Sequence, residues 1–235
     1  MKNVKPYLLI LFILIWASDL QAQKALGIAI GSVTNKFEGD RVSKFFDVGF
    51  RMHSSLLVGL VLDVPIKEDV YITFSPGYKE ISGTIYEENE EYIDQIEQGI
   101  EEPNVPRFID VSFLEIDNLS LPILLKIISD NKRWQFMAGI ETLWNFRSEL
   151  TILDTGEQIN VRSFMKSVNY TAIFGLGYRF KIKKARFAFD LMYTQGLNNM
   201  SSGRELPNGS VPRIKSTTGE TRLTWFFLNK TDNSK

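Results

Sequence analysis

The chain has 235 residues, no cysteine, and 27 lysines and arginines against 28 aspartates and glutamates. This length suits one sizeable domain, and no linker rich in proline, glycine or serine divides it. The lack of cysteine excludes a disulfide framework, a thiolate metal site and a cysteine-linked lipid anchor, and the balanced charge gives no sign of nucleic-acid binding.

The start of the chain has the organisation of an export signal. Lys2 and Lys5 precede an apolar run over residues 7–16, after which the chain turns polar. The run is too short to span a membrane as a helix, which argues against the alternative of an uncleaved anchor. We therefore expect a signal peptide over residues 1–22, cleaved near Ala22.

Beyond this signal, apolar residues recur at every second position, the pattern of strands with one apolar and one polar face. The first three strands are expected at residues 25–34, 55–64 and 70–79. A long polar connection, about residues 35–51, separates the first two, and a tight turn at residues 65–69 joins the second to the third.

The next connection, about residues 82–107, carries the strongest charge bias of the chain. It holds eight acidic residues and no basic residue between Ile81 and Pro106. Apolar residues spaced by four within it favour a short surface helix. We expect a solvated acidic loop over residues 87–102, and the alternative is a cation-bridged contact with lipopolysaccharide or with a basic partner.

The fourth strand, about residues 110–128, contains Pro122, which has no N–H group. We therefore expect a bulge or local distortion there. A tight turn at residues 129–132 leads to the fifth strand, residues 134–147, and a longer polar connection, about residues 153–166, follows.

The most regular alternation belongs to a hairpin formed by residues 167–182 and 186–195. Bulky residues, Phe174 and Leu191 among them, occupy one face, whereas the other face of residues 167–182 is polar or small except for Ile173. Each strand has the height of about ten residues that is needed to cross a bilayer at a tilt. A loop at residues 197–215 and a last strand, about residues 216–228, complete the pattern.

Long and short connections thus alternate along the chain, as in outer-membrane barrels, which have long external loops and short periplasmic turns. We predict an all-β fold, an eight-stranded antiparallel up-and-down transmembrane β-barrel over residues 23–229, followed by a polar tail over residues 230–235. The even number of strands places both termini on the periplasmic side. A barrel of this kind is expected in the bacterial outer membrane.

A soluble carrier barrel would show the same alternation with its apolar face inside. The bulky residues would overfill an eight-stranded interior, which is just wide enough for its inward side chains. Glycines such as Gly175 and Gly177 on the opposite face suit a crowded lumen. Aromatic residues also gather near both ends of the strands, as they do at the two interfaces of a bilayer. We therefore expect the apolar face to contact lipid.

Three short motifs resemble strands of the PorT-like family of small outer-membrane barrels found in Bacteroidetes-type bacteria. They are NLSLPILLK at residues 118–126, similar to L-x-(I/L)-P-x-L-L-K; GLGY at 175–178, similar to G-x-G; and YTQGLNN at 193–199, similar to Y-x-x-G-L-x-N. The resemblance implies an eight-stranded barrel with no assigned catalytic residues. A few members of this family take part in a protein secretion and gliding-motility system, so the resemblance also raises this role for the chain.

Charged residues of both signs fall on the polar face of the strands and would meet inside the barrel. Buried charges must be paired and hydrogen-bonded, so we predict a lumenal salt-bridge network that plugs the barrel. The alternative is a path for protons or ions, for which an eight-stranded lumen leaves no aqueous channel. The predicted members are Asp63, Lys126, Glu141, Arg147, Arg179, Asp190, Glu220 and Arg222.

The single histidine, His53, stands beside Ser54 and Ser55, which makes it the one candidate for a site of the Ser-His-acid type. Adjacent residues of a strand point to opposite faces, and no acidic residue is singled out as the third member. We therefore expect no enzyme activity, and we expect no cofactor and no metal site.

Two classes of function remain open. The first is a structural or interaction component of the outer membrane, in one form linked to protein secretion. Its partners would be the lipid bilayer, lipopolysaccharide and other envelope or secretion proteins, and no nucleic acid. The second is a binding or transport barrel for a small hydrophobic ligand, which would require a cavity in place of a plugged lumen.

Overall fold

The computed structural model describes residues 25–39, 49–98, 105–106, 108–203 and 214–229. Two short helices, α2 (Glu90–Glu97) and the 3-10 helix η1 (Arg162–Phe164), lie in connections. The predicted signal peptide and polar tail lie outside the described residues. The strands are β1 (Ala25–Gly39), β2 (Gly49–Lys67), β3 (Val70–Phe74), β4 (Gly77–Glu88), β5 (Phe108–Ile128), β6 (Trp134–Ile152), β7 (Gln158–Asn160), β8 (Val168–Ile182), β9 (Ala185–Gly196) and β10 (Ile214–Asn229).

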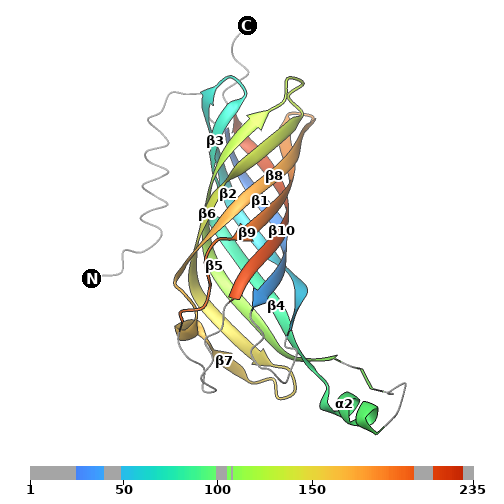
Figure 1. Ribbon diagram of the computed structural model, residues 1–235. Coiled ribbons are helices and arrows are strands. Elements are labelled where there is room, and N and C mark those ends of the chain that lie inside the picture. Colours follow the sequence, from blue (N-terminus) through green and yellow to red (C-terminus); the bar gives the residue numbers. More distant parts are fainter. Residues whose placement is uncertain (1–24, 40–48, 99–104, 107, 204–213, 230–235) are drawn as a thin grey trace, which may run out of the picture.

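The strands pair antiparallel and close into one barrel (Figure 1). β3 and β4 are two parts of one strand interrupted at Ser75 and Pro76, since each pairs with β2 on one side and β5 on the other. β7 is a short addition to β6. The ring therefore runs β1, β2, β3 with β4, β5, β6, β8, β9 and β10, which pairs back with β1. This ring of eight strands confirms the predicted fold.

The apolar face of the barrel wall points outward, as predicted. In β8, Phe174 leaves 58% of its surface exposed, whereas the neighbouring Ile173 is fully buried in the interior. In β9, Leu191 is 50% exposed between the buried Asp190 and Met192. The closed ring satisfies the backbone hydrogen bonds of the strands, and the side chains on its outer face are apolar. Both properties suit a barrel wall that contacts lipid.

The two ends of the barrel differ in the length of their connections (Figure 1). Short turns after Lys67, Ile128 and Ile182 share one end with Ala25 and Asn229, and we call it the turn end. The opposite end carries α2 and β7, and we call it the loop end. There β4 and β5 remain paired out to Glu88 and Phe108, so the connection predicted from residue 82 begins later than expected.

The helix expected in the acidic connection is present as α2, at the tip of this extended hairpin (Figure 1). Asn89 caps it, because its side chain accepts a hydrogen bond from the backbone N–H of Glu91 (3.1 Å). The same side chain donates to the carbonyl of Pro106 (3.0 Å), which ties the start of the helix to the returning chain. Such a cap satisfies one of the otherwise unpaired N–H groups of the first helical turn.

The irregularity expected at Pro122 lies in the neighbouring strand. Pro122 stands opposite Glu141 of β6 without a change of register. Its carbonyl accepts a hydrogen bond from the N–H of Ser75 (3.2 Å), so its missing N–H faces the break between β3 and β4. The register shift of β5 falls instead between Asp117 and Asn118, where β6 has one extra residue.

Candidate functional site

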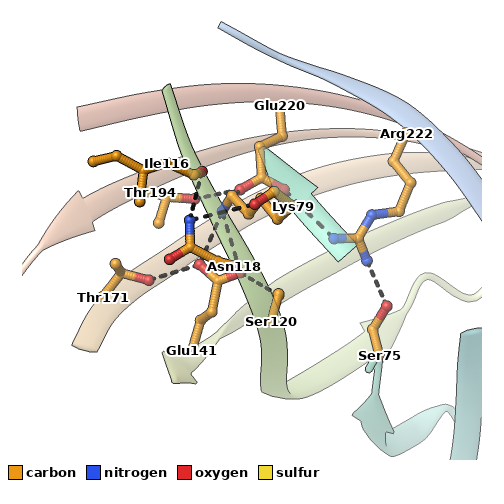
Figure 2. A network of polar contacts seen from close by, with 10 residues as sticks. All are labelled: Ser75, Lys79, Ile116, Asn118, Ser120, Glu141, Thr171, Thr194, Glu220 and Arg222. Carbon is orange, nitrogen blue, oxygen red and sulfur yellow. Dashed lines mark hydrogen bonds and ion pairs between the residues drawn. The ribbon is translucent and has the colours of Figure 1, made fainter. Parts of the chain in front are cut away.

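A lysine in the middle of the lumen organises the buried charges (Figure 2). Lys79, an inward-facing residue of β4, has no exposed surface. Its Nζ lies 2.9 Å from Oε2 of Glu141 in β6 and 2.5 Å from Oε1 of Glu220 in β10. Both carboxylates are buried as well, so one ammonium group and two carboxylates form an ionic cluster removed from water.

Hydroxyl groups from three further strands satisfy these carboxylates (Figure 2). Ser120 of β5 and Thr171 of β8 donate to Glu141 at 2.6 and 2.9 Å, and Thr194 of β9 donates to Glu220 at 3.0 Å. Buried carboxylates are stable in the charged form only when their oxygens are hydrogen-bonded in this way.

Arg222 of β10 extends the cluster toward the turn end. It donates to Glu220 (3.4 Å) and to the hydroxyl of Ser75 at the break between β3 and β4 (2.9 Å). The cluster thus joins β4, β5, β6, β8, β9 and β10 across the lumen. We call it the Lys79 network, and its members are Ser75, Lys79, Ser120, Glu141, Thr171, Thr194, Glu220 and Arg222.

A second buried ion pair joins β2 to β5. Nζ of Lys126 lies 2.7 Å from Oδ1 of Asp63, which also accepts a hydrogen bond from Thr73 (2.7 Å). The same ammonium group lies 5.8 Å from the centroid of the Phe226 ring, within range of a cation–π contact. Farther round the wall, Asp190 of β9 accepts a hydrogen bond from Gln135 of β6.

Six of the eight residues predicted for the lumenal network have buried side chains inside the barrel. They are Asp63, Lys126, Glu141, Asp190, Glu220 and Arg222. The structure does not bring Arg179 into the Lys79 network, because it lies at the turn-end mouth of the barrel.

Arg147 lies outside the lumen. Its side chain is 47% exposed and pairs with Glu115, Asp117 and Glu149. The cause is the extra residue of β6: Asp117 pairs with Arg147 but the next residue of β5 pairs with Asn145. One inserted residue reverses the face on which the following side chains point.

The sequence-based prediction omitted Lys79, whose ammonium group lies between two buried carboxylates of the lumen. A signal was available, because Lys79 occupies the polar face of the third predicted strand. Its partners were not predictable, since Glu141 is 62 residues away and Glu220 is 141 residues away along the chain. Only the stagger of the closed barrel sets them at one level.

The loop end of the lumen is filled by apolar side chains. We call this group the loop-end cluster, and its buried members are Phe37, Ile81, Leu114, Ile116, Leu143, Met165 and Met200. Two connections cross this end, because Met200 accepts a hydrogen bond from the N–H of Lys166 (2.7 Å) and donates one to Ile214 (2.7 Å). The cluster therefore lies between the Lys79 network and the loop-side solvent.

The turn end is open by comparison. A cavity of about 1120 Å³ lies there among the three short turns, and we call it the turn-end vestibule. Asp63 and Phe226 are buried lining residues, and Arg133, Arg179 and Lys181 stand around the cavity. The two ends of the lumen thus differ in both chemistry and access.

His53 does not assemble a catalytic triad with its neighbours. Its ring packs edge-on against Phe113 at 4.8 Å between centroids. Ser55 is buried and shares a hydrogen bond of 2.5 Å with Ser82, while Ser54 shares one of 3.2 Å with Thr34. Within the described residues, no group of three or more histidine, aspartate and glutamate side chains is arranged to hold a metal ion.

Among the described segments, no helix has the length and apolar character of a membrane span. The closed ring of eight strands, with an apolar outer face and buried ion pairs in its lumen, defines a small outer-membrane β-barrel. A family model described as an outer membrane protein beta-barrel domain matches residues 16–202. The match covers well over half of the chain, and the chain belongs to this family of bacterial outer-membrane proteins.

The chain is similar to several solved structures. Neisserial surface protein A is 10% identical, with a TM-score of 0.46 over 86% of this chain and 97% of that chain. Ail of Yersinia pestis is 11% identical, with a TM-score of 0.41 over 88% and 100%. OprG of Pseudomonas aeruginosa is 9% identical, with a TM-score of 0.46 over 87% and 93%. At these values the likenesses carry no inference about function. No curated protein matches the chain.

Proposed function

We propose that this protein is a non-conducting barrel that serves as a structural and interaction component of the outer membrane. The Lys79 network carries the proposal, because it fixes six strands to one another across the lumen and places paired charges where an aqueous path would run. The loop-end cluster supports the proposal, since its apolar side chains fill the loop end of the lumen, beyond the Lys79 network.

Electrical recording tests whether the lumen is closed. The purified barrel, inserted into planar bilayers, is expected to give no steady single-channel conductance, because ions would have to displace buried paired charges and cross the loop-end cluster. A steady conductance from the unaltered protein would contradict the proposal and would favour the ion path instead.

The extended hairpin of β4 and β5 is the part best placed for interaction, because it carries α2 beyond the barrel (Figure 1). Glu91, Asp94 and Glu97 give this helix an acidic surface, and Ile96 on it is 45% exposed. We infer that basic groups of an envelope partner, or lipopolysaccharide bridged by cations, bind here.

Capture from solubilised outer membranes tests this interaction. Residues 89–98 are replaced by a glycine-serine segment of equal length, and the control replaces residues 153–157, a turn between β6 and β7 at the same end. Partners should be lost with the first variant and retained with the control. Equal capture by both would exclude α2 as the contact. A divalent-cation chelator that releases the partner would favour the bridged form of the contact.

We also propose that residues 1–22 are a signal peptide removed near Ala22, on the basis of their charged start and short apolar run. We propose further that the barrel serves a secretion system, as the PorT-like resemblance implies for a few relatives. N-terminal sequencing of the protein isolated from outer membranes tests the cleavage. A strain without the gene is expected to secrete less protein, and unchanged secretion would count against this role.

The alternative of a small hydrophobic ligand is less well supported, because the turn-end vestibule is rich in charged side chains.

A further inference from the structure

We propose that the turn-end vestibule binds an acidic peptide segment that enters from the side of the membrane on which the turn end lies. The proposal goes beyond the function proposed above and depends only on the fold. It begins with the size of the cavity, about 1120 Å³, which is far more than a single small anion needs.

The vestibule is lined by more basic than acidic side chains. Six cations line it, namely Lys67, Lys132, Arg133, Arg179, Lys181 and Arg186, against the three acids Asp63, Glu68 and Asp69. Two of these acids are already neutralised, because Asp63 pairs with Lys126 and Asp69 pairs with Lys132. The remaining balance is strongly positive.

Four of the cations have no acidic partner of their own. Within the described part of the chain, the side chains of Lys67, Arg133, Arg179 and Lys181 form no ion pair. A guanidinium group binds a carboxylate through two parallel hydrogen bonds, and such charge-assisted bonds are stronger than neutral ones. Unpaired arginines around one cavity therefore favour a ligand with several carboxylates.

The direction of these side chains favours a ligand on the barrel axis. Thr171, Ile173 and Gly177 of β8 face inward, and Arg179 and Lys181 continue the same alternation to the end of the strand. Lipid headgroups surround the outer wall, so they are poorly placed to reach inward cations. Tyr71 and Phe226 add aromatic surface to the lining, which suits a peptide better than a bare phosphate ion.

The test uses the full barrel refolded in uncharged detergent micelles and a fluorescent octaglutamate peptide as the probe. Fluorescence anisotropy is expected to show saturable binding that weakens as salt is raised, because exposed charges are screened. An octaglutamine peptide should not bind.

Two double variants distinguish the vestibule from general positive charge. Arg179→Gln with Lys181→Gln removes two lining cations and is expected to weaken binding about tenfold or more. Lys183→Gln with Lys184→Gln removes the same charge from the tip of the same turn, outside the lining, and should change binding less than about twofold. Urea unfolding of both variants checks that each forms the barrel.

Three results would overturn the proposal. The first is that octaglutamate does not bind the unaltered barrel. The second is that both double variants weaken binding equally, which would mean that net charge alone attracts the peptide. In the third, phosphatidylglycerol added to the micelles displaces the peptide from the unaltered barrel and binds the Arg179 and Lys181 variant less well, which would make the vestibule a lipid-headgroup site. Failure of any kind leaves the conductance test of the lumen unaffected.

Discussion

The two ends of this lumen are built from the same eight-stranded ring and yet are finished in opposite ways. At the loop end, Phe37, Ile81 and Leu143 pack with other buried apolar residues. At the turn end, a cavity of about 1120 Å³ opens toward solvent among charged side chains. The difference indicates a barrel that is sealed toward the loops and accessible from the turns, with the Lys79 network as the partition between them.

The largest effect is expected from breaking that partition. Lys79→Met leaves Glu141 and Glu220 buried without the cation between them, and removal of one partner of a buried ion pair costs about 3–5 kcal/mol. Urea unfolding of the barrel in micelles measures the loss. Glu141→Gln in the Lys79→Met background should recover part of it, because one unpaired carboxylate is then neutral.

A surface lysine at the turn end provides the control. Lys132 pairs with Asp69, but its side chain is 55% exposed. Lys132→Met should lower the urea midpoint far less than Lys79→Met does, since exposed ion pairs contribute little to stability. Equal losses for Lys79→Met and Lys132→Met would show that the lumenal network is not the partition inferred from its burial.

The loop-end seal should be weakened next most by removing packed volume. Leu143 is 1% exposed within the loop-end cluster, and Leu143→Ala is expected to cost about 2–5 kcal/mol because it leaves a cavity. Leu191→Ala on the outer wall is the matched control, and it should cost less because lipid chains can fill the space. A larger loss at Leu191 than at Leu143 would contradict the assignment of inside and outside faces.

The inside and outside faces of the barrel were predictable from the sequence, whereas the ionic contacts between distant strands were not. The alternation of Phe174 with Ile173 and Gly175 is local, so it reports which side chains share a face. The Lys79 network depends on which level of one strand stands beside which level of another. That stagger is set by the pairing of distant strands and by single inserted residues such as the one that turns Arg147 outward.

The crowding next to the turn end is tested by adding one methyl group. A Cβ at Gly177 would lie 2.0 Å from Oδ1 of Asp190 and 2.8 Å from Cγ of Gln135, both buried in the lumen. Gly177→Ala should therefore cost about 1–3 kcal/mol through overpacking. Gly219→Ala in β10 is the control, because a Cβ there meets nothing within 4 Å. If both variants unfold at the same urea concentration, the lumen is less tightly filled beside the vestibule than the packing indicates.

The smallest effect concerns the ion pairs that Arg147 forms outside the lumen, toward the loop end of β6. The Arg147 guanidinium, 2.6 Å from Oε2 of Glu149, holds the pKa of that carboxyl below its usual range. A carboxyl with a lowered pKa stabilises the folded state at pH values above its unfolded-state pKa, and this contribution is lost as the pH falls through the folded-state pKa.

Arg147→Gln should therefore lower the urea midpoint slightly at about pH 7, and the difference from the unaltered barrel should shrink as the pH approaches about 3. Unfolding curves at several pH values measure this convergence. A difference that persists at low pH would mean that Arg147 acts through packing of its long side chain, and the ion pairs with Glu115, Asp117 and Glu149 would then contribute nothing measurable to the loop end.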